Sequence, residues 1–376
     1  MNPIAVIMSV FAVVGALDRI FGNKFGLGRE FERGLSTLSS MALSMIGMIV
    51  LAPYIAEVLD PFFSFVGKHL PIDPSIIPAT LFANDMGGAP LATELAKNEE
   101  IGRFNALVVS AIMGCTISFT IPYALEITDK KQQRELVLGL LCGIVTIPVG
   151  CFLGGLVAGV SILPLLINLL PLTLFSALLA VGLVKIPEVC VRIFKVIGTG
   201  IKILITIGLT LGIVKFLTGF SPLKGIGTFE EGAYICFNAA AVMAGAFPMV
   251  ALLSRLLKRP LAKAGGLIAI NEDSTMGIFS NFASTFVTFD LIRNMNKKGV
   301  VLNAAYLVSA GCFSGHLAFT LAYDAGMIPA VIVAKLTGGV LAFLLALPLY
   351  KRFQKSDVTP ETNTETEENA ASEATV

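Results

Sequence analysis

The sequence has few charged residues: Asp, Glu, Lys and Arg make up 14% of its 376 residues, whereas 55% are hydrophobic. Its mean hydropathy of +0.82 lies well outside the range of ordinary soluble domains. We therefore expect the lipid bilayer to surround most of the chain. No soluble catalytic domain and no nucleic-acid partner are expected.

The usual metal ligands are also scarce. The chain has only two histidines, His69 and His316, which lie far apart and outside any metal-ligand pattern. Its six cysteines lie inside apolar segments and form no CxxC pair: Cys115, Cys142, Cys151, Cys190, Cys236 and Cys312. We interpret them as small packing residues, and we expect neither a metal site nor a cofactor.

What the chain has in abundance is long apolar stretches. Runs of about 20 residues, the length that crosses a bilayer as a helix, recur from Ile4 to Tyr350. The first run, Ile4 to Ile20, has no basic residue before it and no small-residue cleavage pattern after it, which argues against a secretory signal. The many Gly and Ala residues, as in TGGVLAF and GCFLGGLVAG, predict close helix packing. The sequence thus predicts an all-α polytopic membrane protein.

Lysine and arginine cluster in a few loops, and such loops remain cytoplasmic. The basic loops lie at 24–33, 130–134, 185–195, 255–263, 293–298 and 351–355. This distribution predicts an N-terminus outside, a cytoplasmic C-terminus and about nine transmembrane helices. It also requires segments 75–96 and 264–292 to be re-entrant hairpins, which enter and leave on one side. If both cross fully, the chain has about eleven spans instead.

Two parts of the chain align with each other at a separation of about 198 residues. FERGLSTLSSMALSMIGMIV, from Phe31, matches FEEGAYICFNAAAVMAGAFP, from Phe229, without a gap. We predict inverted repeats at 1–160 and 194–355, joined by a connector span at 161–193. Inverted repeats with interrupted helices are typical of secondary transporters, which bind substrate where the interrupted segments converge.

The C-terminal segment 356–376 differs from the rest of the chain. It contains six acidic residues and neither Lys nor Arg. A segment this polar cannot bury enough apolar surface to fold, so we expect a disordered cytoplasmic tail.

The two predicted hairpins carry acidic motifs, FANDMGGAP and AINEDSTMG, which we take as their tips. Ionisable groups at membrane depth usually line a pathway or pair with one another. Neither motif has a Lys or Arg nearby, which favours a cationic, hydrogen-bonding substrate. The predicted binding residues are Asn84, Asp85, Asn271, Glu272, Asp273 and Ser274. The alternative is that each carboxylate caps a half-helix.

A second group of polar residues is more simply explained as hydrogen-bond partners between helices or as interface anchors. These secondary candidates are Thr120, Tyr123, Asn238, His316, Thr320 and Tyr323.

With FERG near its start, PATLFANDMGG in the first hairpin and IAINEDSTMG in the second, the chain resembles the ethanolamine-utilisation EutH family of bacterial ethanolamine permeases. The resemblance covers nearly the whole chain except the acidic tail. It implies a multi-pass protein of the bacterial cytoplasmic membrane that admits ethanolamine, whose charged ammonium cannot cross lipid unaided. We expect alternating access at the two hairpin tips and no enzymatic activity.

Two alternatives stay open at this point. One is a cation-coupled secondary transporter of another small metabolite, and the other is an intramembrane enzyme, which would need a catalytic dyad or metal ligands at depth. Transporters with paired hairpins are often dimers or trimers, so a homo-oligomer also stays open. The sequence does not decide between passive and ion-coupled transport.

Overall fold

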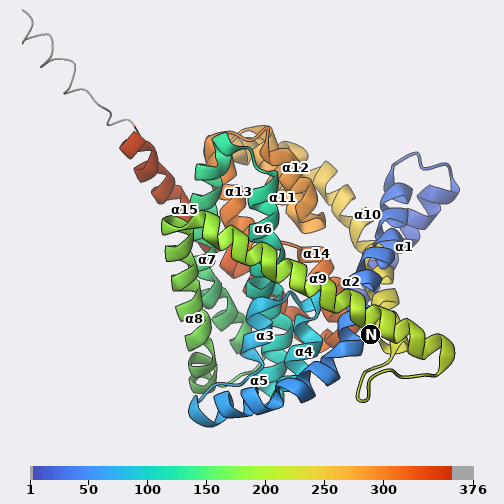
Figure 1. Cartoon of the computed structure of the whole chain (residues 1–376). Helices are drawn as coiled ribbons and strands as arrows, with labels where there is room; N and C mark the ends of the chain where they lie inside the picture. The colour runs from blue at the N-terminus through green and yellow to red at the C-terminus, as the bar shows by residue number, and fades with distance from the viewer. Residues whose placement is uncertain (1–2, 358–376) are drawn as a thin grey trace, which may run out of the picture.

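The computed structural model describes residues 3–357, apart from side chains at 63–68, 187, 191, 254, 257–264, 283, 353 and 355–357. Of the predicted tail, residues 358–376 lie outside the described range. The described residues form helices and loops and contain no strand. Figure 1 shows a bundle of long helices with several shorter ones inside it.

Within the described residues, eight helical stretches are long and apolar enough to cross a membrane, so the all-helical polytopic architecture is confirmed. They cover 3–20, 27–62, 99–127, 130–157, 162–185, 188–218, 229–253 and 297–352. The count is eight, against the nine expected, because the last stretch is a single run of 56 residues. As one straight helix at 1.5 Å per residue that run would measure about 84 Å, far more than the roughly 30 Å of a bilayer core, but it is interrupted at Gly311 and Cys312 and at Ala325–Met327.

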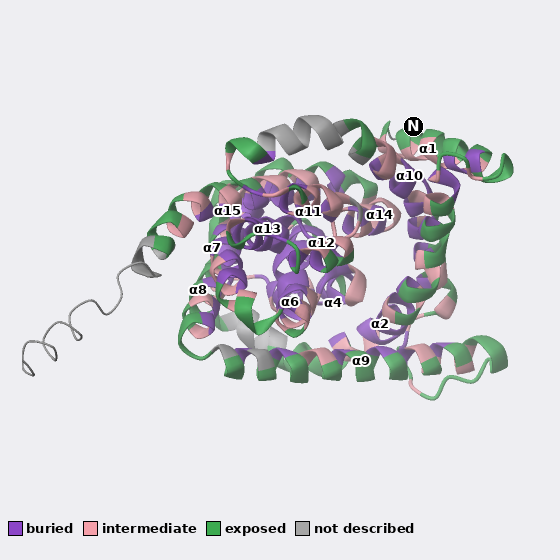
Figure 2. Cartoon of the chain, turned by 90° about the horizontal axis from the view of Figure 1, so that it is seen from above, coloured by how far each residue is buried: buried purple, intermediate pink, exposed green. Residues whose placement is uncertain are grey.

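Five long helices account for much of the outer part of the molecule. They are α1 (Pro3–Ile20), α2 (Leu27–His69), α8 (Ile162–Lys185), α9 (Pro187–Thr218) and α10 (Phe229–Leu267). Figure 2 shows α1, α2, α9 and α10 surrounding the central helices. On α1 and α9 many Val, Leu and Ile side chains are exposed, for example Val13 and Ile203. Such apolar outer faces suit contact with lipid.

The interior contains two pairs of short helices in the segments predicted as hairpins. α3 (Ile76–Leu81) joins α4 (Gly88–Leu95) through the 3-10 turn η1 (Asn84–Met86), and α11 (Glu272–Ala283) joins α12 (Thr285–Ile292) at Ser284. None of these helices exceeds 12 residues, fewer than the roughly 20 needed to span a bilayer. In Figure 1 the α11–α12 pair lies at the opposite end of the bundle from α3 and α4.

The short pairs pack against two interrupted helices. The first runs through α5 (Glu99–Phe104), the π-helical turns η2 (Asn105–Gly114) and η3 (Thr116–Thr120), and α6 (Ile121–Ile127). The second consists of α13 (Lys297–Ala310) and α14 (Phe313–Asp324). Each is followed by a short 3-10 turn, η4 (Lys130–Gln132) or η5 (Ala325–Met327), and a long helix, α7 (Gln133–Val157) or α15 (Ile328–Asp357).

Glycines allow several of these helices to approach closely, as the sequence predicted. Gly150 on α7 faces Gly338 on α15, where an added Cβ would lie 3.0 Å from the Gly338 Cα. An added Cβ on Gly47 of α2 would collide with the Ile205 carbonyl of α9, and one on Gly245 of α10 would collide with the Met8 carbonyl of α1. Backbone-to-backbone packing thus fixes the helices around the interior.

Candidate functional site

The turn between α3 and α4 places Asn84 and Asp85 inside the protein. Asn84 is fully buried, and its Oδ1 accepts a hydrogen bond from the Asp85 backbone N at 3.0 Å. Ala83 N donates to Ser118 Oγ at 3.2 Å, which ties the turn to η3. Gly87 has a φ of 102°, a conformation that glycine adopts without steric cost. Local backbone geometry therefore holds the Asp85 carboxylate at a helix interruption.

The interruption between α13 and α14 lies beside that of the first broken helix. Cys312, at the start of α14, has a φ of 51°, which is uncommon for a residue with a side chain. Its Sγ lies 3.8 Å from Sγ of Cys115, which separates η2 from η3. Thr116 Oγ1 also donates to the Val308 carbonyl at 3.1 Å. The two broken helices thus meet at their interruptions, and strained backbone of this kind is found at functional sites.

A lysine from α15 fills the junction between the two breaks. Lys335 is 1% exposed, and its Nζ donates to the carbonyl oxygens of Ala111 at 2.8 Å, Ser309 at 3.3 Å and Gly311 at 2.7 Å. The ammonium therefore links backbone carbonyls of both broken helices. Lys335 also attracts Asp85 electrostatically.

Lys335 corrects the expectation that no Lys or Arg lies near the acidic motifs. That expectation considered neighbours along the sequence, whereas the lysine arrives from a helix far along the chain. An indication was present in the sequence, because Lys335 is a charge in the middle of an apolar stretch.

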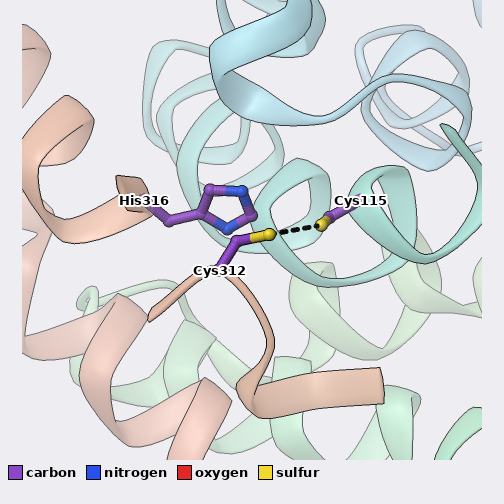
Figure 3. A group of neighbouring side chains, drawn as sticks. All are labelled: Cys115, Cys312 and His316. Carbon is purple, nitrogen blue, oxygen red and sulfur yellow. Dashed lines mark hydrogen bonds between the residues drawn. The ribbon is translucent and has the colours of Figure 1, made fainter. Parts of the chain in front are cut away.

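His316, one of the secondary candidates, joins the carboxylate to the cysteines. Its Nε2 lies 3.7 Å from Oδ1 of Asp85, whose side chain is 27% exposed. His316 is buried, and its Nδ1 has no hydrogen-bond partner among the described residues. Figure 3 shows one ring nitrogen of His316 beside the Cys312 sulfur, with Cys115 just beyond it. The amide nitrogen of buried Asn84 is likewise unpaired within the described part of the chain.

The second acidic motif lies elsewhere. Asn271 is the N-cap of α11: its Oδ1 accepts the Ser274 backbone N at 3.2 Å, and its Nδ2 donates to the Asn294 carbonyl at 2.7 Å. Glu272 is exposed, Asp273 is half-buried and Ser274 is buried. The interpretation of this motif as a hairpin tip was wrong, because the pair turns at Ser284, at the far end of α11.

The two predicted groups are therefore not brought together. Asn84 and Asp85 lie at an internal turn, whereas Asn271 to Ser274 form a helix start beside the loop that precedes α13. The cap of α11 is the amide of Asn271, whereas the capping alternative had assigned that role to the carboxylates.

Two further secondary candidates lie next to the junction. Thr120 is buried, with its Oγ1 3.9 Å from the Cys115 Sγ. Thr320 is buried one turn after His316 and donates to its carbonyl at 2.7 Å.

The remaining three are two tyrosines in aromatic stacks and an asparagine on α10. Tyr123 stacks on Phe119, with ring centroids 5.3 Å apart. Tyr323 stacks on Phe319 and approaches Thr93 Oγ1 with its hydroxyl at 3.1 Å. Asn238 is half-buried on α10.

Comparison with known proteins agrees with the resemblance in the motifs. The family described as "Ethanolamine utilisation protein, EutH" matches residues 2–349. A Listeria monocytogenes protein named "Probable ethanolamine permease EutH" is 40% identical over 94% of this chain and 95% of its own length. A Salmonella typhimurium protein of the same name is 36% identical over 94% of this chain and 97% of its own.

A third relative is less informative by name. The Bacillus subtilis "Uncharacterized protein YxeR" is 35% identical over 91% of this chain and 92% of its own length. No solved structure matches the chain significantly. Since the family match and the relatives at 35–40% identity cover nearly the whole sequence, the chain belongs to the EutH family.

Proposed function

We propose that this protein is a multi-pass permease of the bacterial cytoplasmic membrane that takes up ethanolamine in its protonated form. The observation that carries the proposal is the position of Asp85, an acidic side chain at an interrupted helix inside an apolar bundle. A carboxylate at this depth replaces the water around an ammonium group. The names of the relatives supply the substrate class.

Asp85 is the group best placed to bind the substrate ammonium. Its side chain is 27% exposed, whereas Lys335 is 1% exposed and directs its ammonium at three carbonyl oxygens. Lys335 therefore stabilises the broken backbone without occupying the carboxylate. The partly exposed carboxylate keeps acceptor capacity for a ligand.

The hydroxyl of ethanolamine requires a different partner. The unpaired amide nitrogen of Asn84 is a donor adjacent to Asp85 in the chain. A buried donor without a partner costs about 1–3 kcal/mol, so a ligand oxygen that accepts from it gains affinity. An amine without a hydroxyl leaves this donor unpaired and binds more weakly. Asn84 and Asp85 together thus suit a small amino alcohol.

We also propose that the chain consists of two inverted repeats, 1–160 and 194–355, around the connector 161–193, which contains the whole of α8. The order long helix, short pair, broken helix and long helix occurs from α2 to α7 and again from α10 to α15. Asn98 and Asn296, which correspond in the two repeats, both cap the start of a helix. The side chain of Asn98 accepts a hydrogen bond from the Ile101 backbone N at 2.9 Å, and that of Asn296 accepts one from the Gly299 backbone N at 2.8 Å.

This arrangement supports alternating access. Under this proposal the two short helix pairs are re-entrant hairpins that enter from opposite sides of the membrane. Asp85 is then exposed to each side of the membrane in turn as the two repeats move relative to each other. The proposed orientation has the N-terminus outside and the C-terminus in the cytoplasm, and the distribution of Lys and Arg among the loops supports it. Transport is centred on the first hairpin turn and the junction, rather than on two acidic tips.

The direct test of function is uptake of radiolabelled ethanolamine by proteoliposomes that contain the purified protein. Saturable uptake above that of empty liposomes, inhibited by unlabelled ethanolamine more strongly than by ethylamine, is the expected result. Equal uptake by loaded and empty liposomes would overturn the substrate assignment.

A further inference from the structure

The junction of the broken helices contains a cluster of side chains that substrate binding does not use. The ligand atoms of Cys115, Cys312 and His316 all lie within 4.8 Å of one another. Cys115 lies between η2 and η3, Cys312 directly precedes α14, and His316 lies within α14. Figure 3 shows the three side chains directed towards one another. We propose that these three residues bind a zinc ion.

The spacing of the sulfurs fits tetrahedral zinc. Zinc binds cysteine sulfur at about 2.3 Å, so two sulfurs on one tetrahedral ion lie about 3.8 Å apart. The Cys115 and Cys312 sulfurs are 3.8 Å apart. A disulfide would need the same atoms at about 2.05 Å, so the two thiols, which are in hydrogen-bond contact, are not joined covalently, and an ion could bind both without a change in their separation.

The imidazole is oriented as metal-binding imidazoles usually are. A histidine that binds a metal generally directs its other ring nitrogen at a carboxylate or carbonyl, which fixes the ring. Here Nε2 faces Asp85 at 3.7 Å, and Nδ1 is buried without a hydrogen-bond partner within the described residues. An unpaired buried nitrogen beside two sulfurs is an available ligand, and the unusual backbone of Cys312 holds its sulfur there.

The charges around the cluster also balance a divalent cation. The deprotonated sulfurs of Cys115 and Cys312 and the Asp85 carboxylate supply three negative charges. The Lys335 ammonium and a divalent ion supply three positive charges. Buried charges need such compensation. Two sulfurs and one nitrogen favour zinc over magnesium or calcium, which prefer oxygen, and leave a fourth position open.

An ion at this place would connect the two broken helices. Cys115 belongs to the first and Cys312 and His316 to the second, so the ion fixes their relative positions. Asp85 would at the same time be held towards His316. Bound zinc would therefore stabilise one arrangement of the junction. The site itself does not depend on ethanolamine being the substrate.

Metal binding by the purified full-length protein in detergent tests the proposal without any transport measurement. Cobalt(II) serves as the probe, because tetrahedral cobalt with thiolate ligands gives charge-transfer absorption in the near ultraviolet and visible bands that zinc removes by displacement. We expect one cobalt per chain, loss of the thiolate absorption in Cys115→Ser and Cys312→Ser, and its retention in Cys236→Ser, which alters a buried cysteine on α10.

If the native protein shows no thiolate absorption after cobalt(II) is added, the proposal is overturned, whatever the variants show. Its persistence in the Cys115→Ser/Cys312→Ser double variant would do so as well, because the metal would then be bound elsewhere. Size-exclusion chromatography of each variant shows that folded protein is compared. If cobalt binds but ethanolamine uptake is absent, the metal site stands and only the substrate assignment fails.

Discussion

Ala111 and Ser309, on different broken helices, direct their backbone carbonyls at the same ammonium, the Nζ of Lys335, at 2.8 and 3.3 Å. One side chain thus holds together two irregular stretches of backbone inside an apolar bundle. The same junction brings Asp85 to within 3.7 Å of His316.

Replacement of Lys335 by methionine should destabilise the junction. Methionine preserves the approximate length of the side chain but leaves the carbonyls of Ala111, Ser309 and Gly311 without their donor. Each unsatisfied buried group costs about 1–3 kcal/mol, so we expect a loss of about 3 kcal/mol or more in stability. Thermal unfolding in detergent measures it, with Lys351→Met at the exposed end of α15 as control. Equal melting temperatures for both variants would contradict this role.

Replacement of Gly47 by valine should separate α2 from α9. The new Cβ would collide with the Ile205 carbonyl, and overpacking of this kind costs about 1–3 kcal/mol. The matched control is Gly198→Val on α9, where an added Cβ meets nothing within 4 Å and the substitution should change stability by no more than about 1 kcal/mol. Comparable losses in both variants would indicate that helix propensity, rather than close packing, matters at Gly47.

Replacement of Asn84 by alanine should weaken selection for the hydroxyl group. We expect the KM for ethanolamine to rise about 10- to 100-fold, because the hydroxyl loses a buried donor. Inhibition by ethylamine, which has no hydroxyl, should remain unchanged. Competition measurements on proteoliposomes compare the two amines. A similar loss of affinity for both would show that Asn84 holds the turn rather than the substrate.

Zinc should inhibit uptake through the cluster of Cys115, Cys312 and His316. An ion that binds both broken helices would stop their relative movement, and a chelator should restore transport. The Cys115→Ser/Cys312→Ser double variant should transport at an unchanged rate in the presence of zinc. Inhibition of native protein and double variant at the same zinc concentration would place the inhibitory ion elsewhere.

The sequence was sufficient for the general architecture and the family. Apolar stretches of spanning length predicted a polytopic helical protein, and glycines such as Gly150 and Gly338 proved to lie where helices approach closely. Both properties follow from local composition, which a single sequence displays directly.

The site was only partly predictable, because its members are distant in sequence. Asp85 was identified as an acidic residue in an apolar segment, and His316 only as a secondary candidate. The contact between Cys115 and Cys312 was missed, although their separation of 197 residues is close to that of the repeat, because the apolar surroundings of each cysteine are those of a packing residue. The motif at Asn271 was misplaced because capping residues and binding residues have the same composition, and only the bend at Ser284 distinguishes them.

The central claim is that Asp85 binds the substrate ammonium, and equilibrium binding of radiolabelled ethanolamine to the purified protein tests it most directly. Asp85→Asn removes the charge with little change in shape, and Glu272→Gln is the matched control at an exposed acid. We predict that affinity falls about 10- to 100-fold or more in Asp85→Asn and is unchanged in Glu272→Gln. Native affinity in folded Asp85→Asn would contradict the account.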